Sequence, residues 1–170
     1  NLPIKTVQYV SPSVWAWRQG RVHGIKKSID LVLCLFPFEK GFYQKFDVPA
    51  AFVGHPLASQ LPLENPLNLA KEELDLDISQ KHIALLPGSR TQEIKVKLPL
   101  MLSVEKDFSD YQFVVAGAPS QPIENYKKIA GNDLKIVENR TYDLLRVSHS
   151  ALVTSGTATL ETALLKVPEV

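Results

Sequence analysis

The chain has 170 residues, of which 45% are hydrophobic and 22% are charged, and its formal net charge is +1. This composition is close to the average of soluble proteins, so it provides a core and argues against disorder. The near-zero net charge gives no reason to expect a nucleic acid as partner. The single cysteine excludes an internal disulfide and a cysteine-based zinc cluster, and a reducing, cytoplasmic setting is the simplest expectation.

Short apolar runs alternate with amphipathic stretches along the chain. The apolar runs predict strands at residues 6–10, 31–36, 51–53, 82–86, 112–116, 134–137 and 151–153. Helices are predicted between them at residues 14–29, 67–74, 92–107, 123–130, 142–147 and 157–165. Pro99 is expected to kink or interrupt the helix over residues 92–107. Several runs are continuously apolar, as in parallel strands that are buried on both faces. The alternation predicts an α/β architecture of doubly wound parallel sheets.

A proline-rich stretch at residues 56–66 favours a semi-rigid linker between two α/β units. We therefore place the boundary between residues 1–60 and residues 61–170. The chain begins almost at once with a strand, and it ends where a helix gives way to the start of another strand. We expect it to be an internal piece of a longer protein, with both units incomplete.

The first segment that could carry chemistry combines Trp15 and Trp17 with Arg18. On a continuous helix over residues 14–29, Arg18 would share one face with Trp15 and Val22. An arginine on an apolar face either extends its head to water or points into a site. A tryptophan pair beside cations could also contact a membrane surface. A packed amphipathic helix with a solvated basic side explains the same pattern. A ligand site, a membrane contact and a packed helix therefore all stay open.

The sequence has one cysteine and four histidines, and no cluster of these residues has the spacing of a metal site. Cys34 lies within an apolar run and is expected in the core. His55 stands between a glycine and a proline, and no second ligand follows at a usual spacing, so we expect a hinge residue there. The H-E-x-x-H and G-x-S-x-G motifs are absent, and no metal site or serine hydrolase is predicted.

The second segment that could carry chemistry is the turn at residues 85–90, where a buried strand meets a proline, a glycine and a helix start. Free backbone N–H groups and the helix dipole favour a phosphate at such a turn. Gly88 allows close approach, and Arg90 could bind phosphate oxygens with two hydrogen bonds. Alternatively, Ser89 and Gln92 have the spacing of a capping box, and Arg90 is solvated.

A third segment repeats this arrangement at residues 153–161. Gly156 and Thr157 leave room for a ligand, and Glu161 lies about one turn inside the helix, where its carboxylate could accept hydrogen bonds from a ribose diol. A favourable Glu near the helix dipole is the alternative. Two such turns at the carboxyl ends of strands favour a ligand site. The P-loop and G-x-G-x-x-G patterns are absent, which disfavours an NTPase and a dinucleotide dehydrogenase.

Taken together, five segments resemble the lipid-A-disaccharide synthase family in their order and spacing. They are YVSPSVWAWR at 9–18, PFEK at 37–40, FVGHPL at 52–57, LLPGSR at 85–90 and SGTATLE at 155–161. The resemblance implies a GT-B-like α/β fold of two Rossmann-like domains, both incomplete here. Residues 1–60 would be the C-terminal part of the first, acceptor-side domain. Residues 61–170 would belong to the second domain, which binds the UDP-sugar.

The resemblance also implies an activity. It is the inverting transfer of 2,3-diacylglucosamine from its UDP donor to 2,3-diacylglucosamine 1-phosphate, without metal or other cofactor. The implied UDP-phosphate ligands are Gly88, Ser89, Arg90, Gly156 and Thr157. Glu161 would bind the ribose, and Trp15, Trp17 and Arg18 would line the acceptor or acyl side of the cleft. The general base is expected upstream of this chain, so the catalytic residues are not assigned and the chain by itself is expected to be inactive.

Partners and location follow from the same resemblance. The substrates carry acyl chains, so the family implies a cytoplasmic enzyme at the periphery of the inner membrane. Family members can also dimerise through a C-terminal tail that we expect to be missing from this chain. Two alternatives remain open. One is another GT-B enzyme of UDP-GlcNAc, an epimerase or a polyprenyl-linked GlcNAc transferase. The other is a non-catalytic nucleotide-binding module.

Overall fold

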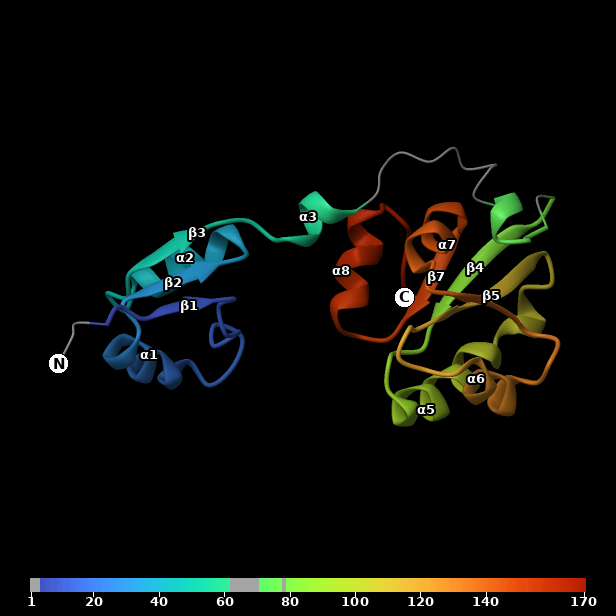
Figure 1. Cartoon of the computed structure of the whole chain (residues 1–170), viewed down its shortest axis with the longest axis horizontal. Helices are drawn as coiled ribbons and strands as arrows, with labels where there is room; N and C mark the ends of the chain where they lie inside the picture. Colours follow the sequence, from blue (N-terminus) through green and yellow to red (C-terminus); the bar gives the residue numbers. More distant parts are fainter. Residues whose placement is uncertain (1–3, 62–70, 78) are drawn as a thin grey trace. The chain divides into compact units, whose positions relative to one another are not determined.

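The computed structural model describes residues 4–61, 71–77 and 79–170, and the chain divides into two compact units, residues 1–60 and 61–170. Each unit holds a parallel sheet whose strands are connected by helices (Figure 1). The predicted α/β class is therefore confirmed. Residues 67–70 of the helix predicted at residues 67–74 lie outside the described ranges, and residues 71–73 are helical. Within these ranges, no helix is long and apolar enough to cross a membrane.

The first unit is a three-stranded parallel sheet with strand order β1-β2-β3. Its elements are β1 (Val7–Tyr9), the 3₁₀ helix η1 (Gln19–Arg21), α1 (Val22–Ser28), β2 (Leu31–Cys34), α2 (Pro37–Gln44), β3 (Ala50–Phe52) and α3 (Leu57–Gln60). Val32 and Cys34 of the central strand are fully buried, and they pack in one cluster with Val22 of α1 and Tyr43 of α2. Cys34 is thus a core residue, as predicted.

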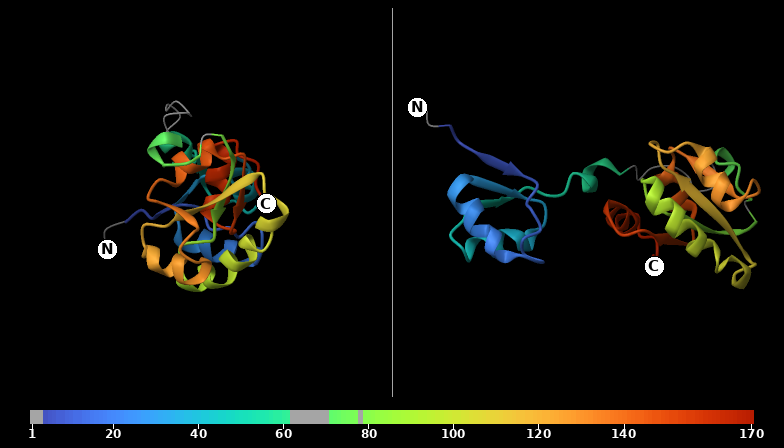
Figure 2. Two further views of the ribbon diagram at one scale, coloured as in Figure 1. Left: turned by 90° about the vertical axis from the view of Figure 1, so that its right-hand side faces the viewer. Right: turned by 90° about the horizontal axis from the view of Figure 1, so that it is seen from below.

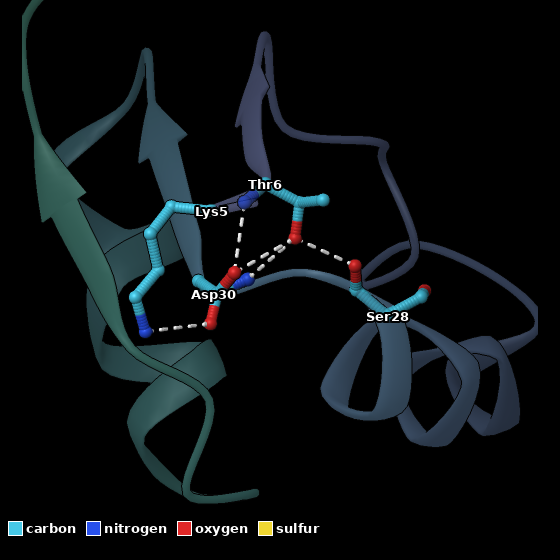
Figure 3. A network of polar contacts seen from close by, with 4 residues as sticks. All are labelled: Lys5, Thr6, Ser28 and Asp30. Carbon is cyan, nitrogen blue, oxygen red and sulfur yellow. Dashed lines mark hydrogen bonds and ion pairs between the residues drawn. The ribbon is translucent and has the colours of Figure 1, made fainter. Parts of the chain in front are cut away.

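A polar network joins the starts of β1 and β2 (Figure 3). The Thr6 N–H donates to Asp30 Oδ2 at 2.8 Å, and the Thr6 hydroxyl donates to the Ser28 carbonyl at 2.7 Å. The Lys5 ammonium lies 3.4 Å from Asp30 Oδ1. The hydrogen bond from the Thr6 backbone contributes most to lowering the pKa of Asp30. These contacts hold the two strands side by side where their pairing begins.

The predicted helix over residues 14–29 is wrong in its first half. The α-helix begins only at Val22, and the preceding residues form turns and the short η1 helix. Arg18 has φ +54°, the left-handed conformation, which no continuous right-handed helix can include. Trp15 and Arg18 therefore do not share a helix face with Val22. The periodicity of the apolar residues was outweighed by the contacts that Trp15 makes with α2, described below.

The second unit is a four-stranded parallel sheet with strand order β6-β5-β4-β7. Its described elements are β4 (Lys81–Leu86), α5 (Thr91–Leu102), the 3₁₀ helix η2 (Glu105–Asp107), β5 (Tyr111–Gly117), α6 (Ile123–Ala130), β6 (Lys135–Glu138), α7 (Thr141–Val147), β7 (Ser150–Val153) and α8 (Thr157–Leu164). One residue of the segment after α8 pairs with β7, since Ala151 forms a parallel bridge with Glu169.

Helices cover both faces of this sheet (Figures 1 and 2). Ile83 and Leu85 of β4 pack in a cluster with residues of α5 and α6, whereas Ala84 and Leu86 pack with residues of α7 on the opposite face. Successive side chains of a strand point to opposite faces, so a strand between two helical layers must be apolar throughout. This burial on both faces explains the continuous apolar run in the sequence of β4.

The helix predicted at residues 92–107 is shorter than expected, and Pro99 does not interrupt it. It ends at Leu102, and a separate 3₁₀ turn follows. Pro99, which was expected to kink or interrupt the helix, lies inside it, and the helix continues to Leu102. Pro99 and Lys95, whose carbonyl loses its partner, are both exposed, so water can replace the missing hydrogen bond.

Candidate functional site

A hollow of about 380 Å³ lies at the carboxyl edge of the four-stranded sheet. The strand order reverses between β4 and β7, because β5 and β6 lie on one side of β4 and β7 on the other. Ligands of open α/β sheets bind at such a reversal. The hollow brings together all six residues predicted on the nucleotide side, namely Gly88, Ser89, Arg90, Gly156, Thr157 and Glu161.

The turn after β4 depends on a glycine at position 88. Gly88 has φ +108°, a conformation that residues with a side chain rarely adopt. A Cβ atom built there would lie 2.5 Å from Glu93 Oε2 and 2.9 Å from Glu93 Cβ. The residue therefore allows a carboxylate to approach the backbone of the turn, and any larger residue would fill that space.

Arg90 and Glu93 form an ion pair at the wall of the hollow. The distance from Arg90 Nη1 to Glu93 Oε1 is 2.6 Å, and the Arg90 side chain is 80% exposed. The Ser89 N–H donates to Glu93 Oε2 at 3.3 Å. The Arg90 hydrogen bond contributes most to lowering the pKa of Glu93. The proposed capping box of Ser89 and Gln92 is not formed, because Arg90 occupies the N-cap position and no side chain caps the helix.

Two side chains from the turn after β5 hold the turn after β4 in place. The Gln121 amide donates to the Ser89 carbonyl at 3.0 Å and accepts from the Thr91 hydroxyl at 3.1 Å. The Ser120 hydroxyl donates to the same Ser89 carbonyl at 3.3 Å. The conformation of the predicted phosphate turn thus rests on residues that the local sequence pattern did not reveal.

The turn after β7 presents small residues at the start of α8. Gly156 has φ +154° and ψ −153°, and no atom outside its own neighbourhood lies within 4 Å of where a Cβ would stand. The turn is tied to the first one, because the Thr154 N–H donates to the Leu86 carbonyl at 2.9 Å. Thr157 begins the helix, so its N-terminus faces the same hollow.

Glu161 lies half-buried on α8, at the boundary between two hollows. The Tyr142 hydroxyl of α7 donates to Glu161 Oε1 at 2.9 Å. Burial, followed by the hydrogen bond to Glu161, raises the pKa of Tyr142. Among the described residues, Tyr142 is the only side chain that donates to this carboxylate. The sequence pattern gave no signal for this contact, because it joins two helices that pack only in the folded unit.

A second hollow of about 420 Å³ adjoins the first and shares Pro119, Thr141 and Glu161 with it. Arg140 also lines it, and its guanidinium is already paired. Its Nε lies 2.8 Å from Asp143 and its Nη2 lies 2.6 Å from Glu73. The hydrogen bond to Asp143 contributes most to raising the pKa of Arg140. Glu161 therefore has a space on either side.

Trp15 in the first unit is anchored in the fold. Its indole N–H donates to Glu39 Oε1 at 3.3 Å, and its ring meets Phe38 edge-on, with the centroids 4.9 Å apart. Glu39 is only 2% exposed, and its other oxygen accepts the backbone N–H groups of Leu35 and Phe36, each at 3.0 Å. The buried carboxylate is thus fully engaged in fixing the start of α2.

Trp17 and Arg18 differ from Trp15, because both are exposed. The Trp17 side chain is 59% exposed, and the Arg18 guanidinium lies 4.8 Å from the centre of its ring. This cation–π pair projects from the turn before η1. His55, expected at a hinge, accepts the Leu57 N–H at its Nδ1 over 3.2 Å.

The chain is similar over its whole length to one family of known proteins. A model of the lipid-A-disaccharide synthetase family matches residues 1–170. The chain is 49% identical to the lipid-A-disaccharide synthase of Acinetobacter baylyi, covering 100% of this chain and 47% of that protein. It is 43% identical to that of Psychromonas ingrahamii, covering 98% and 46%. The chain thus spans about half the length of the curated relatives it matches.

Solved structures are similar in fold alone. The wall teichoic acid polymerase TagF, a GT-B glycosyltransferase, superimposes with a TM-score of 0.52 at 15% identity, covering 89% of this chain and 40% of that chain. This agrees with the GT-B-like α/β fold expected from the sequence. The family match over the whole chain also confirms the resemblance carried by the five segments. The chain belongs to the lipid-A-disaccharide synthetase family.

Proposed function

We propose that this protein acts as a lipid-A-disaccharide synthase. It would transfer 2,3-diacylglucosamine from UDP-2,3-diacylglucosamine to 2,3-diacylglucosamine 1-phosphate, and it would release UDP. Family membership supports the reaction. The observation that carries the proposal to this chain is the hollow at the strand-order reversal, which collects two helix starts, an arginine and a carboxylate.

These groups are arranged in the order in which UDP presents its diphosphate, its ribose and its uracil. The diphosphate would lie against the Gly88–Arg90 turn and the Gly156–Thr157 turn, where backbone N–H groups and the N-termini of α5 and α8 favour negative charge. Glu161 would accept hydrogen bonds from the ribose hydroxyls. The second hollow, on the far side of Glu161, would then hold the uracil of UDP.

The same groups would assist the chemical step. When the acceptor hydroxyl attacks the anomeric carbon, the bond to UDP breaks and negative charge builds on the diphosphate oxygens. Preoriented N–H groups and the Arg90 guanidinium would stabilise that charge as it develops. This mode of stabilisation requires no bound metal. We assign no general base within the described residues.

The acyl chains of both substrates imply contact with a lipid surface. We propose that the protein lies at the cytoplasmic face of the inner membrane, and the exposed Trp17 and Arg18 support a contact through this turn. Substituting both by alanine should reduce cosedimentation with anionic vesicles. Equal cosedimentation of the wild type and this variant would contradict the proposed membrane contact. The homodimer that the resemblance implies is tested by light scattering of the full-length protein, which includes the C-terminal tail, over a range of concentrations.

The test of the nucleotide site is a calorimetric titration of UDP into the chain in the presence of EDTA. A charge-assisted hydrogen bond contributes roughly 1.5–3 kcal/mol, so Arg90→Ala should weaken UDP about 10- to 150-fold. Glu161→Ala should weaken UDP and uridine alike, because it removes the ribose contact.

Glu124→Ala serves as the control, because Glu124 is exposed in the first turn of α6 and outside both hollows. Unchanged UDP affinity in both site variants would contradict the placement of the nucleotide. Because the general base is expected upstream of this chain, product analysis with an acylated acceptor uses the full-length protein. It separates the synthase from the other GT-B enzymes and from a non-catalytic binding module.

A further inference from the structure

The carboxylate of Glu93 lies against the turn after β4. Its Oε1 accepts a hydrogen bond from Arg90 Nη1 at 2.6 Å, and its Oε2 accepts one from the Ser89 N–H at 3.3 Å. That second oxygen also lies 2.5 Å from where a Cβ of residue 88 would stand. A backbone N–H, an arginine and a glycine without a side chain thus all face one anionic group, and this group belongs to the chain itself.

These are the same donors that the proposed function gives to the diphosphate. A carboxylate and a phosphate oxygen both accept charge-assisted hydrogen bonds, and two anions cannot share one set of donors without repulsion. Glu93 lines the hollow together with Ser89 and Arg90. A phosphate that binds there must therefore displace the carboxylate or remain outside the turn.

Displacement requires no rearrangement of the core. Glu93 stands in the first turn of α5, and its side chain is 30% exposed, while that of Arg90 is 80% exposed. The buried residues of this helix, Ile94, Leu98 and Met101, pack in a core cluster that includes neither Arg90 nor Glu93. An exposed ion pair is a weak interaction, so a ligand with two phosphates can replace it.

We propose that Glu93 is an internal stand-in for the phosphate, and that it sets the affinity and selectivity of the site by competing with anionic ligands. The proposal rests on the proposed function of this hollow. A neutral nucleoside need not displace the carboxylate, whereas a nucleoside diphosphate must. Glu93 therefore determines how much the phosphates add to binding.

The experiment compares UDP and uridine in calorimetric titrations of the chain and its Glu93→Gln variant. Glutamine keeps the shape and one acceptor oxygen but removes the charge. We expect UDP to bind about three- to tenfold more tightly to Glu93→Gln, while the affinity for uridine changes less than about twofold. Glu124→Gln removes the same charge from the first turn of α6 and should change neither affinity.

Each outcome decides the proposal. Tighter binding of UDP alone supports the stand-in. Weaker or unchanged UDP binding in Glu93→Gln, with uridine still bound, means that Glu93 only braces Arg90, and the stand-in is refuted while the nucleotide site stands. Equal gains for UDP and uridine also refute it. If neither ligand binds any variant, the proposed nucleotide site itself is wrong, and the stand-in falls with it.

Discussion

His82 is a buried titratable residue outside the candidate site. It lies in β4 beside Gln112 of β5 and is fully buried. Neither ring nitrogen has a hydrogen-bond partner among the described residues. Burial, with a further contribution from the charge of Lys71, lowers the pKa of His82 below its ordinary value of 6.5. The imidazole is therefore neutral in the folded chain at neutral pH.

This burial predicts a loss of stability in mild acid. Below pH 6.5 the unfolded chain binds a proton on His82 that the folded chain resists, so the free energy of unfolding falls as the pH drops toward the folded pKa. The loss between pH 7.5 and 5.5 should be at most about 1.4 kcal/mol, the limit that applies if the folded chain takes up no proton on His82 in this range. Urea unfolding followed by circular dichroism should show it in the wild type and not in His82→Gln.

The matched control is His149→Gln, which removes an exposed histidine from the same unit. It should keep the pH dependence of the wild type. An equal loss of stability in all three proteins would mean that carboxylates, and not His82, cause the loss.

Single residues also show how far sequence could predict the site. The sequence could predict that Gly88, Arg90, Gly156 and Glu161 lie near one another, because in each case strand, turn and helix follow one another directly in the chain. The structure places them around one hollow, and their role in binding stays a prediction. The spacing of Arg90 and Glu93 is that of an ion pair on a helix, and this signal could have been used. Gln121 and Tyr142 had no such signal, because their partners belong to segments far away in the chain.

At the scale of elements, α7 orients a side chain of α8. Tyr142 holds one oxygen of Glu161 and leaves the other for a ligand. Tyr142→Phe removes this hydrogen bond and keeps the ring. The carboxylate should then be less well oriented, and the preference for UDP over 2′-deoxy-UDP should fall by about three- to tenfold. Calorimetric titration of both ligands measures the preference.

A preference unchanged by Tyr142→Phe would show that Glu161 is oriented without this hydroxyl. Tyr111→Phe is the control for the loss of a tyrosine hydroxyl, because Tyr111 lies in β5 and lines neither hollow. It should leave the preference for UDP as it is.

Elements differ in how well the sequence predicted them. The strands lie within two residues of their predicted bounds, and α6 spans residues 123–130 as predicted. Buried parallel strands leave a continuous apolar run, which is a strong signal. The helix over residues 14–29 failed because apolar periodicity does not reveal a left-handed residue at Arg18. Nor could it reveal that the indole of Trp15 binds the buried Glu39 carboxylate.

At the scale of the whole molecule, each unit has its own core. The cluster of the first unit draws on residues 14–50, and the two clusters of the second unit draw on residues from 74 onward. Both tryptophans of the chain, Trp15 and Trp17, lie in the first unit. Tryptophan fluorescence therefore reports on that unit alone, and circular dichroism reports on both.

This division predicts that the units can be destabilised separately. Leu98 is fully buried under the second sheet, so Leu98→Ala should lower the stability of this unit by about 2–5 kcal/mol. The unfolding transition seen by circular dichroism should shift, while that seen by tryptophan fluorescence stays in place. Leu100→Ala, at a 64% exposed position of the same helix, is the control. A joint shift of both signals would show that the units unfold together.

The hollow of the second unit is bounded by turns that follow β4, β5 and β7, which are far apart in the chain. A ligand that fills it would touch all three at once and would act as a noncovalent cross-link. At a concentration a hundredfold above its Kd, such a ligand adds about 2.7 kcal/mol to stability. Because only residues 61–170 line the hollow, the gain belongs to that unit. Under the proposed function, each donor that binds would slow hydrogen exchange along this edge of the sheet, and each UDP that leaves would restore it.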